Sequence, residues 1–129
     1  SYILRDFDLD GLNQRKAKIE EIAKILQQKY GEDRIIVEIK DSYYNMKEKI
    51  EPVMYIIDLA KKAMKDADVE PKIVPIRGGT DGARISYMGI PTPNLFTGGY
   101  NFHGYYEYAV AEEMEKAKEV IINIVKNNK

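Results

Sequence analysis

Cysteine is absent from the sequence, and histidine occurs once, at His103. Without cysteine there can be no disulfide bond and no thiolate metal site, so a metal ion would need histidine, aspartate or glutamate ligands. A catalytic metal site usually takes about three protein ligands or more. The chain is therefore poor in ligands for a complete metal site of its own.

An excess of charge of one sign and long apolar runs are also lacking. The 20 basic and 21 acidic residues leave a net charge of −1, which gives neither a basic face for nucleic acid nor a polyacidic tail. No apolar run reaches the length needed to cross a membrane, and no signal-peptide pattern is visible at the start. We therefore expect neither nucleic acid nor a membrane as a partner.

The chain does have enough apolar material for a domain. It has 129 residues, of which 44% are apolar, and a chain of this size can bury a core. It opens at Ser1 directly on a strand-like run, without an initiator methionine. We expect a fragment of a longer protein; removal of the methionine plus a short expression scar is the alternative.

The first part of the chain predicts a strand, a helix and a second strand. Residues 2–7 alternate weakly between apolar and polar, and residues 34–40 are rich in β-branched side chains, so both are predicted strands. Between them, residues 11–30 carry apolar side chains at helical spacing. Gly31 is predicted to end this helix, because glycine tolerates a positive φ.

The rest of the chain alternates helices and short strands after a polar, tyrosine-rich hinge. The predicted elements are the hinge at 41–49, helices over 52–67, 80–88 and 111–126, and strands over 72–76 and 94–97. One face of the last helix is predicted to be apolar through Met114, Ala117, Ile121, Ile124 and Val125. Such an alternation is typical of the α/β fold class.

A glycine-rich turn, Arg77-Gly78-Gly79-Thr80, is the first candidate site. Two glycines let a backbone approach a ligand closely, and a helix that begins at Thr80 has free N–H groups that favour anions. An ordinary strand-to-helix turn with Thr80 as its cap accounts for the same residues.

The loop that follows Gly98 and carries His103 is the second candidate. It comes directly after a predicted strand, at the edge where α/β proteins place ligands, and a neutral imidazole is a common zinc ligand. Glu107 lies four residues further on and could orient the ring. A lone histidine is, however, more often structural or simply solvated.

Two further candidates lie nearer the start. Arg5 lies on the first predicted strand and can hold a carboxylate through two parallel hydrogen bonds, although composition alone favours a surface arginine paired with a neighbouring aspartate. Asn45 and the tyrosines beside it in the hinge could line a pocket or simply pack the hinge.

Taken together, these segments resemble the C-terminal part of the peptidase T family. The likeness rests on Ile3-Leu4-Arg5-Asp6-Phe7-Asp8, Asp41-Ser42-Tyr43-Tyr44-Asn45-Met46, Ile76-Arg77-Gly78-Gly79-Thr80-Asp81-Gly82-Ala83 and Tyr87-Met88-Gly89-Ile90-Pro91-Thr92-Pro93-Asn94-Leu95-Phe96-Thr97-Gly98-Gly99-Tyr100-Asn101-Phe102-His103-Gly104. Their order and spacing are similar to the family's from near Ile3 to about Ile121.

The resemblance implies a cytoplasmic, two-domain tripeptide aminopeptidase that holds two zinc ions. In this family a smaller lid domain, which often mediates dimerisation, interrupts an α/β catalytic domain. Residues 1–42 would be the second half of the lid, and residues 43–129 the C-terminal part of the catalytic domain. Zinc-activated water would hydrolyse the N-terminal residue from a tripeptide, with a glutamate upstream of this chain as the general base.

The resemblance also implies roles for individual residues. His103 matches the family's last zinc ligand, and Arg5 matches a lid arginine that grips the free carboxylate of the substrate. Substrate-binding roles are further implied for Asn45, Arg77, Gly79, Thr80 and Gly98. One departure follows His103, where Tyr106 stands in place of a second histidine found in the family.

Because the other ligands and the general base lie outside the chain, we expect at most weak zinc binding and no peptidase activity from these 129 residues alone. Two other functions remain possible from the residues. One is a standalone α/β module that binds a small anion through Arg5, Arg77 and Thr80. The other is a self-associating interaction module, since an unpaired sheet edge tends to pair with itself. Homo-oligomers are thus expected.

Overall fold

A computed structural model describes residues 1–76 and 78–128, so the candidate Arg77 lies outside the described residues. The structure is mostly helical with one small two-stranded sheet. The chain separates into two compact units, Ser1–Asn45 and Met46–Lys129, which we call unit 1 and unit 2. Among the described residues, no helix combines the length and the apolarity needed to cross a bilayer.

Unit 1 is built on the helix α1 (Leu9–Tyr30), which confirms the predicted helix. It ends as predicted at Gly31, whose φ is +104° and whose N–H donates to the Gln27 carbonyl oxygen. At the other end, Asp8 occupies the N-cap position without a side-chain hydrogen bond to the helix. A short 3-10 helix, η1 (Glu32–Arg34), follows α1 and reverses the chain.

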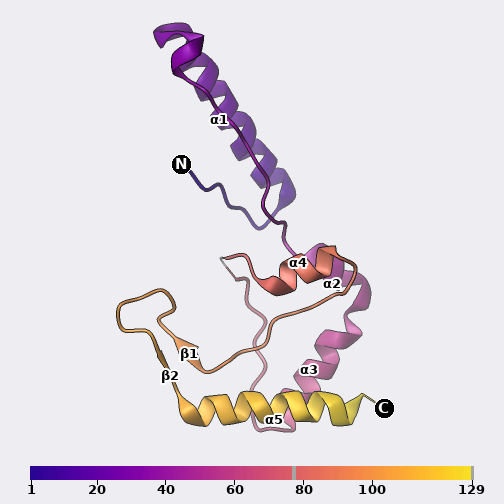
Figure 1. Cartoon of the computed structure of the whole chain (residues 1–129). Helices are drawn as coiled ribbons and strands as arrows, with labels where there is room; N and C mark the ends of the chain where they lie inside the picture. The colour runs from indigo at the N-terminus through magenta and orange to yellow at the C-terminus, as the bar shows by residue number, and fades with distance from the viewer. Residues whose placement is uncertain (77, 129) are drawn as a thin grey trace. The chain divides into compact units, whose positions relative to one another are not determined.

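The segment after η1 runs back along α1 (Figure 1). Gln27 Nε2 donates to the Ile35 carbonyl oxygen at 2.7 Å, and the Lys16 ammonium lies 2.5 Å from the Asp41 carboxylate. These two contacts hold both ends of the returning segment against one helix, which is the main tertiary contact of unit 1.

Unit 2 contains four further helices, one 3-10 turn and the sheet. They are α2 (Lys47–Ile50), η2 (Glu51–Val53), α3 (Tyr55–Lys65), α4 (Asp81–Tyr87), β1 (Gly99–Tyr100), β2 (Tyr108–Ala109) and α5 (Ala111–Asn127). Its apolar core lies where α3 meets α5, at Ala63, Ala67 and Val120. The partly buried side chains of Met64, Val69, Leu95, Phe96 and Ile124 pack against this core.

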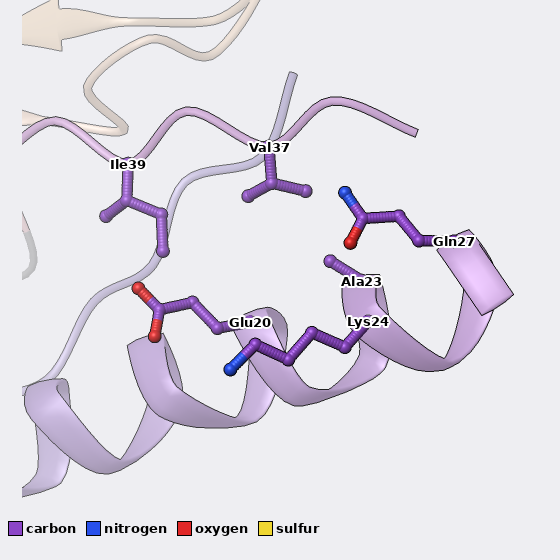
Figure 2. A pocket seen from close by; sticks show the side chains of 6 residues that line it. All are labelled: Glu20, Ala23, Lys24, Gln27, Val37 and Ile39. Carbon is purple, nitrogen blue, oxygen red and sulfur yellow. The ribbon is translucent and has the colours of Figure 1, made fainter. Parts of the chain in front are cut away.

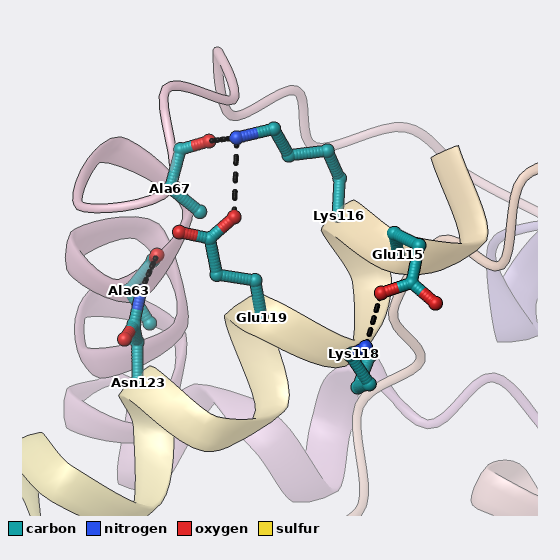
Figure 3. Close-up of polar contacts among 7 residues, drawn as sticks. All are labelled: Ala63, Ala67, Glu115, Lys116, Lys118, Glu119 and Asn123. Carbon is teal, nitrogen blue, oxygen red and sulfur yellow. Dashed lines mark hydrogen bonds and ion pairs between the residues drawn. The ribbon is translucent and has the colours of Figure 1, made fainter. Parts of the chain in front are cut away.

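Polar side chains of α5 also bind the end of α3 (Figure 3). The Lys116 ammonium donates to the Ala67 carbonyl oxygen at 2.9 Å and to Glu119 at 3.1 Å. Asn123 Nδ2 donates to the Ala63 carbonyl oxygen at 3.4 Å. Ala67 lies in the turn just after α3, so Lys116 ties this turn to α5, and its positive charge lies on the favourable side of the carboxyl end of α3.

The four predicted strands over 2–7, 34–40, 72–76 and 94–97 do not form in the described structure. Across residues 1–76 and 78–128 the paired strands are β1 and β2, joined antiparallel with Gly99 opposite Ala109 and Tyr100 opposite Tyr108. A strand exists only when its backbone N–H and C=O groups are paired with a neighbouring strand. The four segments have the composition of strands but no such neighbour in the described part of the chain.

Two helix predictions also need correction. The hinge predicted at 41–49 contains the start of α2, and the helix predicted over 52–67 is a 3-10 turn followed by α3. On α5, Val120 is the fully buried residue, whereas Met114, Ile121 and Val125 of the predicted apolar face are exposed. Two apolar stripes run along this helix, and contact with α3 buries the one that includes Val120 and Ile124.

Candidate functional site

Thr80 begins α4, as the sequence predicts. Its backbone is extended, and its hydroxyl oxygen accepts a hydrogen bond from the Ala83 N–H at 3.2 Å. The same oxygen accepts from Asn94 Nδ2 at 3.1 Å, a contact that the sequence did not reveal. Gly79 is exposed beside it. The Thr80 hydroxyl oxygen thus accepts two structural hydrogen bonds, one from α4 and one from the segment that carries Asn94.

The glycine-rich turn is also held by close packing. A Cβ atom on Gly82 would lie 2.5 Å from the Thr92 carbonyl oxygen and 2.8 Å from Asn94 Oδ1, closer than any side chain can approach. Ser86, only 2% exposed, accepts a hydrogen bond from the Thr92 N–H at 2.9 Å. The glycine at position 82 therefore serves the contact between α4 and the segment 92–94.

Gly98 lies at the base of the hairpin formed by β1 and β2. Its φ is +78°, and a Cβ atom there would lie 2.9 Å from the Glu113 Cβ. Its carbonyl oxygen accepts from the Val110 N–H at 2.8 Å. Both the conformation and the lack of space require glycine, because this residue seats the hairpin on the first turn of α5.

Tyrosines stiffen the base of this hairpin. The rings of Tyr100 and Tyr108 stack with their centroids 5.3 Å apart. The Tyr100 hydroxyl donates to the Glu113 carboxylate at 2.7 Å, and this hydrogen bond raises the pKa of Tyr100 above its ordinary value. The hairpin is thus tied to α5 through its first strand.

His103 lies exposed in the turn region of the hairpin, with a φ of +63°. Its backbone N–H donates to Glu107 Oε2 at 2.9 Å. Glu107 was considered from sequence as a residue that orients the imidazole ring; in the structure it binds the backbone of His103. No polar partner of the imidazole is found among the described residues, so the ring is presented to the surroundings.

Arg5 and Asn45 lie in unit 1. Asn45 Nδ2 donates to the Phe7 carbonyl oxygen at 3.0 Å, which brings Asn45 to the segment that carries Arg5. The neighbouring Asp6 carboxylate accepts from Arg15 Nε at 2.7 Å. This hydrogen bond, together with one from the Asp8 N–H, lowers the pKa of Asp6.

The predicted site residues do not form one cluster within unit 2. Among the residues that the structure describes, no hydrogen bond joins Thr80 to the hairpin that carries His103. A groove of about 300 Å³ lies elsewhere, in unit 1, between α1 and the returning segment (Figure 2). It is lined by Glu20, Ala23, Lys24, Gln27, Val37 and Ile39, and contains none of the predicted site residues.

The residues present fit zinc chemistry only in part. The exposed imidazole of His103 is a suitable nitrogen donor. Over residues 1–76 and 78–128, however, no three histidine, aspartate or glutamate side chains are grouped to hold a metal ion. The described part of the chain thus offers one metal ligand and not a complete site. These residues alone do not support a metal-dependent reaction.

Comparison with known proteins identifies the relatives of the chain. No protein-family model matches it. A protein from Geobacillus sp. (strain WCH70) is 62% identical over 125 residues, which are 97% of this chain and 30% of the relative, and its name is peptidase T. This chain is homologous to peptidase T. The peptidase T of Clostridium perfringens (strain 13 / Type A) is 61% identical over 126 residues, covering 98% of the chain and 31% of the relative.

The similarity extends to peptidase T of Bacillus cereus (strain B4264), at 56% identity over 125 residues, with 97% of the chain and 30% of the relative covered. The chain therefore spans about 30% of the length of the curated relatives it matches. These relatives are peptidases by name, and the family likeness found in the loop sequences is confirmed.

Proposed function

We propose that this chain is the C-terminal part of a zinc-dependent tripeptide aminopeptidase that acts in the cytoplasm. The observation that supports the proposal is the 62% identity to a peptidase T over 97% of the chain. At that identity the chain and its relatives share a fold, and the matched stretch covers nearly all of this chain. No observation supports the alternative of a standalone module that binds small anions.

Within that protein, we assign residues 1–42 to the second half of the lid and residues 43–129 to the end of an α/β catalytic domain. The strand-like segments would then pair with strands supplied by the remaining part of the protein. Their exposed apolar side chains support this assignment, among them Ile36, which is 85% exposed, and Ile73 and Val74. Burial against neighbouring strands would remove these side chains from water.

The residue roles follow the same proposal. His103 supplies one zinc ligand, and residues outside this chain supply the others together with the general base. When bound, the metal supplies an activated water for hydrolysis. Arg5 binds the free carboxylate of the peptide, which a guanidinium holds with two parallel hydrogen bonds. The substrate site is further bordered by Asn45, Arg77, Gly79, Thr80 and Gly98.

A hybrid enzyme tests this function. In the peptidase T of Geobacillus sp. (strain WCH70), the matching 125 residues are replaced by this chain. The hybrid should hydrolyse an unmodified tripeptide, and His103→Ala should abolish that activity and lower the zinc content. Glu70→Ala, at an exposed position away from the loops, is the matched control and should retain activity.

A hybrid that folds and keeps full activity with His103→Ala would show that the histidine is not a zinc ligand. The separate 129-residue chain should show no turnover of the same tripeptide with zinc added, because it offers one ligand and no complete site. Turnover by the chain alone at enzyme-like rates would contradict the assignment of the general base to the rest of the protein.

We further propose that the separate 129-residue chain forms homo-oligomers. Without the rest of the protein its strand-like segments stay unpaired and apolar, and unpaired strands tend to pair with another copy.

A further inference from the structure

Two successive turns shape the tip of the hairpin that carries His103. The Gly104 N–H donates to the Asn101 carbonyl oxygen at 2.8 Å, and the Glu107 N–H donates to the Gly104 carbonyl oxygen at 3.3 Å. Asn101 and His103 both adopt left-handed backbone conformations, with φ values of +54° and +63°. Such conformations are uncommon for residues other than glycine, although asparagine and histidine adopt them more readily than most, and a nearby contact can hold them in place.

The Glu107 side chain makes a contact that holds the backbone of His103 in this conformation. Its Oε2 atom accepts a hydrogen bond from the His103 N–H at 2.9 Å, so the end of the second turn is joined to His103 in the first. Hydrogen bonds to an ionised carboxylate are stronger than those between neutral groups. Among the described residues, this side chain is the one that binds the backbone of His103, and it comes from the far side of the turn.

The rest of the hairpin does not depend on Glu107. Its base is held by the stacked rings of Tyr100 and Tyr108 and by the hydrogen bond from Tyr100 to Glu113. The tip is compact, because a Cβ atom on Gly104 would lie 2.6 Å from Asn101 Nδ2. The feature that the Glu107 carboxylate can influence is therefore the backbone orientation of His103, and with it the direction of the His103 side chain.

We propose that Glu107 is a positioning residue for His103. It fixes the backbone of His103, and through it the direction of the imidazole, without itself binding a metal or transferring a proton. The link between this geometry and zinc rests on the proposed function; the geometry of the loop does not. A positioning role needs only an oxygen that accepts the N–H, so glutamine should replace glutamate here.

The first test uses the 129-residue chain itself. Amide hydrogen exchange, followed by NMR, should be on the order of tenfold faster at His103 in Glu107→Ala. It should be close to the unmodified rate in Glu107→Gln and in the control Glu70→Ala. Unchanged exchange at His103 in Glu107→Ala, in a protein with otherwise unchanged spectra, would overturn the proposal.

The second test uses the hybrid enzyme and measures both kcat/KM and bound zinc. Residues that orient a metal ligand typically contribute about 10- to 100-fold, so Glu107→Ala should lower zinc affinity and kcat/KM by that range. Glu107→Gln should restore both to near the unmodified values. If glutamine is as damaging as alanine, the carboxylate acts as a ligand or a base, and the positioning role is wrong.

The two failures are distinguishable. An unmodified hybrid that folds but does not hydrolyse tripeptides rejects the proposed function, while the exchange rates at His103 still decide whether Glu107 holds the loop. An active hybrid whose Glu107→Ala variant keeps full zinc content and kcat/KM rejects the positioning role alone.

Discussion

Single polar side chains fix the local geometry of both candidate loops. The Thr80 hydroxyl oxygen begins α4 and also accepts from Asn94, so one atom joins two segments 14 residues apart. At the hairpin, the Tyr100 hydroxyl and the Glu113 carboxylate join β1 to α5. Each contact depends on one side-chain hydroxyl group, so a single substitution can remove it.

Thr80→Ala should lower the free energy of unfolding by about 1 kcal/mol, because the Ala83 N–H loses its cap. Thr80→Ser keeps the hydroxyl and should cost clearly less. Urea unfolding followed by circular dichroism measures both variants. Equal stability of the alanine variant and the unmodified chain would show that the cap contributes nothing to the folded state.

The Tyr100 hydroxyl should titrate at a higher pH than an ordinary tyrosine. It donates a hydrogen bond to the Glu113 carboxylate, which favours the protonated hydroxyl, and the negative charge of Glu113 disfavours the phenolate. The contribution of this contact to stability is complete below the ordinary value of 10.0 and is lost as the pH rises through the raised pKa of the folded chain.

NMR titration of the Tyr100 ring checks this prediction. Glu113→Gln should bring the pKa of Tyr100 back toward its ordinary value, since the charge is gone. The neighbouring Glu112→Gln is the matched control and should change it little. A pKa of Tyr100 that is the same in all three proteins would contradict the contact.

At the scale of the elements, the packing of α3 on α5 holds unit 2 together. Val120 is 0% exposed and packs with Ala63 on α3 and with Ala67 in the turn that follows α3. These small alanines let α3 and α5 approach closely. Asn123 binds the Ala63 carbonyl oxygen in the last turn of α3, and Lys116 binds the Ala67 carbonyl oxygen just after it. The interface thus combines a small apolar centre with polar contacts to exposed backbone groups.

Val120→Ala should lower the free energy of unfolding by about 2 kcal/mol, from lost apolar burial and the cavity that remains. Val125→Ala makes the same chemical change on the same helix at a residue that is 70% exposed, and it should change stability by less than about 0.5 kcal/mol. Thermal or urea unfolding compares the two. Similar losses for both would mean that α5 packs through a different face.

At the scale of the whole molecule, the chain exposes apolar side chains on both units while it spans about 30% of the length of its relatives. In unit 1, residues 35–40 follow η1 without pairing to another strand, and Ile36 is exposed. An unpaired strand-like segment is a template for pairing with another chain.

The 129-residue chain should therefore self-associate, with a mean mass by light scattering that rises with concentration. Ile36→Lys places a charge on the strand-like segment and should reduce the association. Met88→Lys removes an apolar side chain that is 82% exposed but lies at the end of a helix, and it should reduce association less. A monomer at all concentrations would contradict the proposed homo-oligomer.

The helices α1, α4 and α5 could be predicted from the sequence, together with the end of α1 at Gly31 and the cap at Thr80. These features depend on side-chain spacing and on residues within a few positions of one another. The sequence also carried the family likeness, because the quoted loop segments are contiguous in the sequence and need no tertiary structure to be recognised. Glu107 was recognisable as a neighbour of His103, but which atom it binds was not.

Tertiary structure alone decided which apolar stripe of α5 is buried and whether the strand-like segments pair. Val120 is buried because α3 lies against it, although its distance from Ala63 in the sequence gives no local sign of that contact. A strand needs hydrogen bonds from a neighbour, and residues 35–40 remain unpaired because no other strand lies beside them in the described part of the chain. Local pattern specifies a helix, whereas a sheet and a core face are specified by partners remote in the chain.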